Sequence, residues 1–290
     1  MKIAIIGAGN VGTALAVLFH TAGHKITGIA SRTESSAARA AGLVQAPYDT
    51  NPAAFTKNAD ITFLTTPDRA ITDVCEQIAL WNGFTSGSIV AHTSGAHSSA
   101  ILDSAAKRGT YTISFHPLQT FANPDAGIKN LPGSFITVEG HPEALPAARS
   151  LVGDLECRLL EIPTDGKALY HAAACIACNY FSTLTEAALS VMEAAGVSKK
   201  DALPALYPLI EGTLKNIMRV GTVQSLTGPI ARGDTSTIEA HLAGMQKQIP
   251  ELIPLYTLLG RATVDMAEAK GTIDTVQRRN LLKILGGEEE

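Results

Sequence analysis

The chain has 290 residues, of which 46% are hydrophobic and 17% charged, which is enough for two domains with sizeable cores. Its 23 basic and 27 acidic residues give a net charge of −4 without a basic stripe, which argues against a nucleic-acid partner. No apolar stretch reaches the length of a membrane span, and the first apolar run ends in glycines, unlike a signal peptide. We therefore expect a cytoplasmic protein with no membrane partner.

A glycine-rich loop directly follows the first apolar run. The run 2–6 leads into Gly-Ala-Gly-Asn-Val-Gly, and an apolar helical segment, 14–19, comes next. This is the strand–loop–helix context of a dinucleotide-binding fingerprint, in which Gly7 permits a tight turn, Gly9 admits a pyrophosphate and Gly12 allows close helix packing. The amides at the helix N-terminus would hold the anion. The cofactor-binding residues predicted here are Gly7, Gly9, Asn10, Val11 and Gly12.

Apolar strands and helices alternate through the first half of the chain. This alternation predicts an α/β fold with a doubly wound, mainly parallel sheet, whose strands are apolar because helices cover both faces. The predicted strands are 2–6, 25–30, 61–65, 88–93, 111–115, 135–139 and 158–162, and the helices between them include 34–41, 69–79 and 98–107.

The character of the sequence changes after Pro163. Residues 166–195 are rich in Ala, Leu and Met and carry no strand pattern, so an all-helical region is predicted. Its later helices are predicted at 202–220, 235–248 and 252–270. The predicted domains are 1–163, which binds the dinucleotide, and 164–290, which is helical and serves the substrate and dimerisation.

The end of the second strand indicates which dinucleotide is bound. NAD sites usually carry an Asp or Glu there, which bonds the ribose hydroxyls. Here Ser31 and Arg32 follow the strand, and a hydroxyl with a guanidinium suits a 2′-phosphate. We therefore predict NADP. NAD stays an alternative, because Arg32 can be an ordinary surface residue and Glu34 lies only slightly too late to bond the ribose.

Ligands of parallel sheets lie beyond the carboxyl ends of the strands, so the loops there are candidate site segments. Asp68 is predicted to cap the helix that follows it. His116 can donate a proton or bond a substrate carboxylate, and the alternative is a buried histidine whose nitrogens are satisfied. The further residues predicted to line the cofactor are Thr65, Thr66, Pro67, Ser94 and Gly95.

Polar side chains recur on the apolar helix that begins near residue 166. At about 100° per residue, they fall within one stripe of roughly 80°. Lys167 can act as general acid or bind a developing alkoxide, whereas the alternative is an exposed lysine with His171 bonded to a loop. The two cysteines in the stripe lack further metal ligands and are expected to be core fillers, so no metal site is predicted. The stripe comprises Lys167, His171, Cys175, Cys178 and Ser182.

Three residues are predicted to hold the polar end of a substrate. Asn179 is an amide among apolar neighbours, and Arg232 lies in a polar, glycine-containing loop, where it can clamp a carboxylate or phosphate. Thr235 ends this loop, and either Asp234 or Thr235 can cap the following helix. A purely structural loop is the alternative.

Several motifs together resemble a family of bacterial Rossmann-like NADP oxidoreductases. The resemblance spans nearly the whole chain and is carried by the following segments: Gly7-x-Gly9-x-x-Gly12, His92-Thr93-Ser94-Gly95, His116-Pro117-Leu118-Gln119-Thr120-Phe121, Tyr170-His171-Ala172-Ala173-Ala174 and Thr227-Gly228-Pro229-x-x-Arg232-Gly233-Asp234.

This family is similar in architecture to pyrroline-5-carboxylate reductase, ketopantoate reductase and the β-hydroxyacid dehydrogenases. The resemblance implies a Rossmann domain, a C-terminal domain like that of 6-phosphogluconate dehydrogenase, and a homodimer formed through the helical domain. It also implies a catalytic role for Lys167. In the latter two groups an asparagine follows that lysine by four residues, whereas His171 stands here, and the resemblance supplies no substrate.

These observations predict an NADP-dependent oxidoreductase that reduces a small, carboxylate-bearing carbonyl or imine compound in an interdomain cleft. The expected catalytic residues are Lys167, His171 and His116. Two alternatives stay open. One is a non-catalytic NADP(H) sensor, and the other is an enzyme like prephenate dehydrogenase, for which His116-Pro117 is the suggestive feature.

Overall fold

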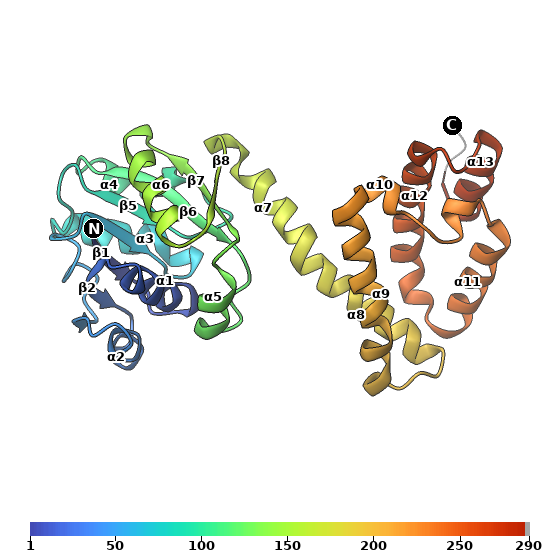
Figure 1. Ribbon diagram of the computed structural model, residues 1–290, viewed down its shortest axis with the longest axis horizontal. Helices are drawn as coiled ribbons and strands as arrows, with labels where there is room; N and C mark the ends of the chain where they lie inside the picture. Colours follow the sequence, from blue (N-terminus) through green and yellow to red (C-terminus); the bar gives the residue numbers. More distant parts are fainter. Residues whose placement is uncertain (288–290) are drawn as a thin grey trace. The chain divides into compact units, whose positions relative to one another are not determined.

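The computed structural model describes residues 1–287 and divides the chain into two compact units, Met1–Ala177 and Cys178–Glu290 (Figure 1). The first unit is built on a sheet, and the second is helical throughout its described residues. The expected domain boundary after residue 163 stays a prediction.

The first unit contains an eight-stranded sheet in the order β3-β2-β1-β4-β5-β6-β7-β8. Every neighbouring pair is parallel except β6 and β7, so the expected mainly parallel sheet is confirmed. Strand β3 was not predicted, because it is only two residues long. The strands are β1 (Lys2–Ile6), β2 (Lys25–Ala30), β3 (Tyr48–Asp49), β4 (Ile61–Leu64), β5 (Ile89–His92), β6 (Tyr111–Leu118), β7 (Phe135–Gly140) and β8 (Arg158–Glu161).

Strand β6 corrects one prediction. It was expected to end at Phe115, with His116 in a loop, but it continues to Leu118 in antiparallel register with β7. His116 pairs with Thr137 and therefore lies within the strand. The parallel pairing with β5 ends at Ser114, so the remainder of β6 has no ladder on that edge. A free edge tolerates a proline, which is why Pro117 does not end the strand.

Helices cover both faces of the sheet, as Figure 1 shows. Alternate strand residues enter two separate apolar clusters: Ile5 and Phe63 pack with α1 and α6, whereas Ile6 and Leu64 pack with α3. This period of two is what a sheet buried on both faces requires. The helices are α1 (Asn10–Thr21), α2 (Glu34–Gly42), α3 (Asp68–Leu80), α4 (Asp103–Ala106), α5 (Pro124–Asn130) and α6 (Leu145–Asp154).

The helix that follows the sheet is not one uninterrupted α-helix. Helix α7 spans Lys167–Cys175 and gives way to a π-helical turn, Ile176–Tyr180. A π turn holds more residues than an α turn, so the 100° period does not continue past Cys175. The predicted stripe therefore holds for Lys167, His171 and Cys175 but not for the residues beyond them.

The second unit is a set of helices around a small core, which includes Ile238, Val264 and Leu281. Helix α13 was not predicted; it begins with a capping box in which Asp274 and Gln277 bond reciprocally. None of the helices in the described part of the chain is long and apolar enough to cross a membrane. The helices are α8 (Phe181–Ala194), α9 (Lys199–Val220), α10 (Thr222–Ser225), α11 (Thr235–Gln248), α12 (Ile253–Lys270) and α13 (Thr275–Ile284).

Candidate functional site

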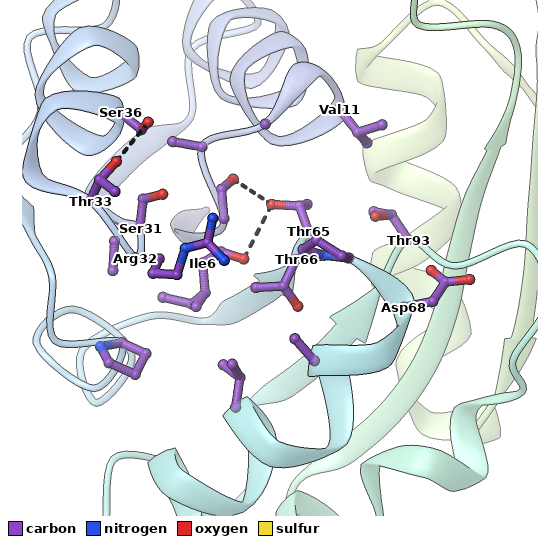
Figure 2. A pocket seen from close by; sticks show the side chains of 18 of the residues that line it. Ile6, Val11, Ser31, Arg32, Thr33, Ser36, Thr65, Thr66, Asp68 and Thr93 are labelled. Atoms are coloured by element: carbon purple, nitrogen blue, oxygen red, sulfur yellow. Dashed lines mark hydrogen bonds between the residues drawn. The ribbon is translucent and has the colours of Figure 1, made fainter.

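A cavity of about 850 Å³ lies in the first unit beyond the carboxyl ends of β1, β2, β4 and β5 (Figure 2). We call it the glycine-loop cavity. Nine of the twelve predicted cofactor residues line it: Gly7, Gly9, Asn10, Val11, Ser31, Arg32, Thr65, Thr66 and Pro67. Gly12, Ser94 and Gly95 are not among its lining residues.

Two glycines of the loop are required by the fold itself. Gly7 has a φ of +120°, and a Cβ there would lie 2.6 Å from the backbone carbon of Thr65. A Cβ on Gly12 would collide with the carbonyl oxygen of Gly7 and the hydroxyl of Thr65. That hydroxyl donates to the Gly7 carbonyl at 2.7 Å. Dashed lines in Figure 2 mark the hydrogen bonds of Thr65. The loop, α1 and β4 are therefore packed with no room for side chains at these two positions.

Gly9 differs, because a Cβ there would meet no protein atom within 4 Å. The open space lies at the N-terminus of α1, where the first amides have no partners within the helix. The N-cap carries no side-chain hydrogen bond, and the first turn holds no acidic residue. This arrangement suits an anion such as a pyrophosphate, which fits the chemistry of a dinucleotide.

Polar groups further along the cavity also fit a nucleotide. The hydroxyl of Thr66 is buried and has no hydrogen-bond partner among the described residues. Such an orphaned group costs free energy unless a ligand satisfies it. The side chain of Asn10, in contrast, donates to the carbonyls of Phe121 and Ala122 at 2.9 and 3.2 Å, so it fixes a neighbouring segment of the cavity wall.

The end of β2 carries no carboxylate. Ser31 and Arg32 line the cavity at this point, and Arg32 is exposed and forms no ion pair within residues 1–287 (Figure 2). Thr33 donates to Ser36 at 2.8 Å, so two further hydroxyls lie beside the guanidinium on the cavity wall. Hydroxyls and an unpaired guanidinium are suited to a phosphate monoester.

Ser94 holds a network of hydrogen bonds, and its predicted contact with the cofactor stays a prediction. Its hydroxyl donates to Asp68 at 2.9 Å and accepts from the amides of Ala96 and His97, so its hydrogen-bonding capacity is filled. Asp68 was predicted to cap α3, but it is the first residue of that helix and Pro67 occupies the N-cap. The Asp68 carboxylate is instead committed to Ser94, and the pair ties α3 to the loop after β5.

Lys167 is buried, with 2% of its surface exposed, so it is not the exposed lysine of the alternative interpretation. Its Nζ donates to the hydroxyl of Ser114 at 2.6 Å and lies 5.3 Å from the centre of the Tyr170 ring. Burial lowers the pKa of Lys167 to about 8, against the opposing influence of Glu139 and Asp68. An ammonium with this pKa can release or regain a proton near neutral pH.

His116 lies beside this lysine. Its Nδ1 forms a 2.7 Å hydrogen bond with the hydroxyl of Tyr170. Burial lowers the pKa of His116 to about 3, and the charges of Lys167 and His171 act in the same direction. The imidazole is therefore neutral over the physiological range.

His171 completes the group. Its Nδ1 is buried without a partner in the described structure, and its Nε2 lies 3.6 Å from the sulfur of Cys175. The rings of His171 and His116 are 6.2 Å apart, and a Cβ on Gly95 would lie 2.5 Å from His171 Nδ1 and 2.8 Å from His116 Nε2. The two imidazoles therefore pack closely against Gly95, where a side chain would have no room. We call Ser114, His116, Lys167, Tyr170 and His171 the lysine–histidine cluster.

The loop after β5 joins the two features. Thr93 lines the glycine-loop cavity, and Gly95 faces the two histidines. The three catalytic candidates from the sequence thus meet in one place, next to the loop that borders the cavity.

Sequence reasoning assigned no role to Ser114 or Tyr170. Ser114 is two residues before His116 on β6, and Tyr170 is three residues after Lys167 on α7. Residues two apart on a strand, or three apart on a helix, share a face. These spacings were the signal available in the sequence, because they place each residue beside a catalytic candidate.

The three predicted substrate residues belong to the second unit. Asn179 is exposed within the π turn, Arg232 is exposed at the end of a 3₁₀ turn, and Thr235 begins α11. Asp234 is the cap of this helix and accepts from the amide of Thr237 at 3.1 Å. The part of these residues in substrate binding stays a prediction.

The described residues contain no group of three or more His, Cys, Asp or Glu side chains that could hold a metal ion. All four cysteines are free thiols, and Cys175 contacts His171 without further ligands. The cysteine pair of the predicted stripe therefore has no partners for zinc in this structure.

Comparison with protein families identifies two consecutive domains. Residues 1–117 match a Rossmann-like domain, and residues 134–263 match DUF2520, a domain of unknown function. A comparison with curated proteins finds no match. The Rossmann-like match agrees with the dinucleotide-binding domain that the resemblance in the sequence implied.

Solved structures share this architecture. BF3122 from Bacteroides fragilis is 25% identical, with 91% of this chain and 98% of that chain covered and a TM-score of 0.73. An imine reductase from Myxococcus stipitatus, in complex with NADP+, is 16% identical, with 97% and 100% covered and a TM-score of 0.66. A pyrroline-5-carboxylate reductase from Coxiella burnetii is 14% identical, with 92% and 97% covered and a TM-score of 0.59.

Proposed function

We propose that this chain, a Rossmann-like domain followed by a DUF2520 domain, is an NADP-dependent oxidoreductase that reduces a small carbonyl or imine compound. The observation that carries the proposal is the glycine-loop cavity, in which an open helix N-terminus and the unpaired Arg32 lie among the lining residues. NADP+ in the similar imine reductase supports the choice of cofactor. In this scheme residues 1–163 bind the dinucleotide and residues 164–290 serve the substrate and dimerisation.

Each part of the cavity has a task in this proposal. The amides after Gly9 hold the pyrophosphate, Thr66 provides a hydroxyl to the cofactor, and Ser31 with Arg32 holds the 2′-phosphate. When bound, NADPH supplies the hydride. The loop from Thr93 to Gly95 leads from this cavity to the lysine–histidine cluster.

The cluster binds and protonates the group being reduced. The Lys167 ammonium stabilises the negative charge that develops in the cluster as the substrate is reduced, and one of the polar groups around it supplies a proton. The same cluster would be of no use to a protein that only senses NADP(H), because a buried lysine costs free energy and contributes nothing to binding the nucleotide. We propose that Arg232, with Asn179 and Thr235, holds a carboxylate on the substrate.

We also propose that the protein is a homodimer formed through the helical unit. Helix α9 exposes Tyr207, Leu209 and Met218 by 59, 67 and 86%. Apolar side chains at such density on one helix are typical of a subunit interface. Light scattering of the protein and of Leu209→Glu with Met218→Glu tests this, with a dimer expected for the first and a monomer for the second.

The experiment that tests the proposed function is fluorescence titration with NADPH and NADH. We expect NADPH to bind more tightly than NADH. Arg32→Ala should weaken NADPH binding by about 10- to 100-fold, the effect of losing charge-assisted hydrogen bonds, and leave NADH binding unchanged. Arg39→Ala, which removes an exposed arginine of α2 that does not line the cavity, is the matched control. Absence of binding by either nucleotide would overturn the proposal.

A further inference from the structure

The lysine–histidine cluster contains a continuous series of contacts that ends at a ring nitrogen without a partner among the described residues. Lys167 lies over the ring of Tyr170, and the hydroxyl of Tyr170 bonds to Nδ1 of His116. The other nitrogen of His116, Nε2, lies against Gly95, has no hydrogen-bond partner among the described residues and is not fully buried, so a substrate atom can approach it. The series thus runs from a cation, through a phenol and an imidazole, to the point where His171 Nδ1 also converges.

The direction of the central hydrogen bond follows from the chemistry of its partners. The hydroxyl of Tyr170 forms its hydrogen bond with His116 Nδ1, and a half-buried phenol needs an acceptor for its proton. A phenol is a much stronger acid than the N–H of a neutral imidazole. Tyr170 therefore donates to Nδ1, which leaves the imidazole proton on Nε2 of His116.

We propose that His116 is the residue that protonates the substrate, with Tyr170 as its proton source and Lys167 as the group that stabilises the resulting phenolate. This inference rests on the proposed reduction of a carbonyl or imine. It assigns three separate tasks within the cluster, where the sequence left the proton donor open between the lysine and the histidines.

The proton transfers balance as follows. As the carbonyl carbon accepts the hydride, its oxygen takes the proton from His116 Nε2, and an alcohol forms. His116 Nδ1 takes the proton of the Tyr170 hydroxyl, so the imidazole stays neutral and only its tautomer changes. The negative charge ends on Tyr170. Before the next turnover His116 Nε2 takes a proton from solvent and the Nδ1 proton returns to Tyr170, which restores both the phenol and the Nε2–H tautomer. An imine follows the same path with nitrogen in place of oxygen.

The residues around His116 favour a neutral imidazole that passes a proton on over a positively charged one. Burial and the charge of Lys167 lower the pKa of His116 to about 3, so an imidazolium is disfavoured, whereas a neutral imidazole can accept and donate together. Burial also raises the pKa of Tyr170, which keeps it protonated at rest. Its ionisation during turnover then depends on Lys167, whose Nζ lies 5.3 Å from its ring centre.

Other charged and titratable groups around His116 do not replace Lys167 in this task. His171 also lies against Gly95, and Glu139 is held on the neighbouring strand β7 by hydrogen bonds from Ser99 and Thr164. His92, on β5, accepts from the amide of Ser94 and bonds the carbonyl of Ser98, so both of its nitrogens are engaged. Lys167 is therefore the cation that contacts the tyrosine.

The tautomer of His116 can be read without a substrate. Long-range ¹H–¹⁵N spectra of protein labelled in histidine, assigned with His116→Gln, should show a neutral ring protonated at Nε2 from pH 5 to 9. Tyr170→Phe should convert part of the population to the Nδ1–H form, whereas Tyr111→Phe, at the opposite end of β6, should change nothing. A ring protonated at Nδ1 in the wild type would overturn the inference, because Nε2 would have no proton to give.

The kinetic arm uses NADPH oxidation with a panel of small aldehydes, ketones and cyclic imines. Tyr170→Phe should lower kcat by about 100-fold with KM nearly unchanged, the loss expected for general acid catalysis. The decrease in kcat in heavy water should be larger in Tyr170→Phe than in the wild type, because His116 then regains its proton more slowly. NADPH titration of the wild type and of Tyr170→Phe separates the two ideas. Absence of nucleotide binding in the wild type overturns the proposed function, whereas unchanged kcat in Tyr170→Phe overturns the relay alone.

Discussion

The glycine-loop cavity and the lysine–histidine cluster are built from different parts of the chain. The cavity is formed mainly by backbone: Gly7, Gly9 and Gly12 act through the side chains they lack, and α1 contributes its free amides. The cluster is formed by side chains, with a buried lysine and two histidines held in place by hydrogen bonds and ring contacts. The first is suited to an anion of fixed shape, and the second to moving protons.

This difference predicts how each region responds to substitution. A change in the cavity should alter nucleotide affinity or the fold, whereas a change in the cluster should alter turnover and leave affinity intact. The four predictions that follow test this separation, from the largest expected effect to the smallest.

The largest effect is expected at Lys167. Lys167→Met keeps the side-chain volume but removes the charge that contacts Ser114 and Tyr170. Turnover of any carbonyl or imine identified in the NADPH screen should fall by about 100- to 10,000-fold. NADPH affinity, measured by fluorescence, should stay within about twofold.

Lys107→Met, which removes an exposed lysine paired with Asp103, is the control and should retain full turnover. Equal turnover by Lys167→Met and the wild type would show that the cluster has no part in catalysis. Weaker NADPH binding by Lys167→Met would instead show that the two regions are not separate.

Next comes a pair of substitutions within the cavity. Gly12→Ala forces a methyl group against the Gly7 carbonyl and should lower the free energy of unfolding by about 2–3 kcal/mol. Gly9→Ala meets no protein atom and should cost about 1 kcal/mol or less, yet weaken NADPH binding at least about tenfold. Denaturant unfolding and NADPH titration of both variants measure the contrast.

The two glycines thus separate what the fold needs from what the ligand needs. Normal NADPH binding by Gly9→Ala would mean that the open space at the start of α1 is not where the nucleotide binds. Normal stability of Gly12→Ala would mean that α1 can move away from β4 at no cost.

The part of the fold that the sequence predicted is the part governed by local chemistry. The strand, loop and helix around Gly7 to Gly12 occupy one short segment, and each glycine has a local steric reason. The predicted end of β6 was wrong, because His116-Pro117 is typical of a turn. Only the pairing with β7 shows that the strand continues. The prediction that Asp68 caps α3 was wrong for a similar reason, because its hydrogen-bond partner, Ser94, lies on a loop that is distant in the sequence.

The cluster was predicted only in part for the same physical reason. Lys167 and Ser114 are 53 residues apart, and His116 and Tyr170 are 54 apart. Polarity on an apolar helix identified Lys167 and His171 as unusual, but no spacing rule links them to β6. Such contacts depend on how α7 packs on the sheet, which a single sequence does not encode in any local pattern.

A pH-dependent stability difference should accompany the burial of Lys167. Its pKa in the folded protein is about 8, below the ordinary 10.5, so above pH 8 the unfolded chain holds a proton that the folded chain has released. The free energy of unfolding should therefore rise with pH in the wild type relative to Lys167→Met, by about 2 kcal/mol between pH 8 and 9.5. Urea unfolding of both proteins at several pH values tests this, and parallel curves would contradict it.

The smallest effect is expected at the buried hydroxyl of Thr66. Thr66→Val removes an orphaned polar group, so the protein without ligand should be unchanged or more stable by about 1 kcal/mol. If the hydroxyl bonds the nucleotide, NADPH should bind about fivefold more weakly, because the ligand loses one hydrogen bond.

Thr110→Val is the matched control, since its hydroxyl is also buried and without a partner among the described residues but does not line the cavity. It should give the same gain in stability with no change in NADPH affinity. If Thr66→Val and Thr110→Val bind NADPH with equal affinity, the Thr66 hydroxyl does not bond the cofactor. Weaker NADPH binding in Thr66→Val alone would show that the ligand satisfies a hydroxyl that the fold leaves unpaired. Thr66 would then be a side chain that binds the nucleotide together with the backbone amides of the cavity.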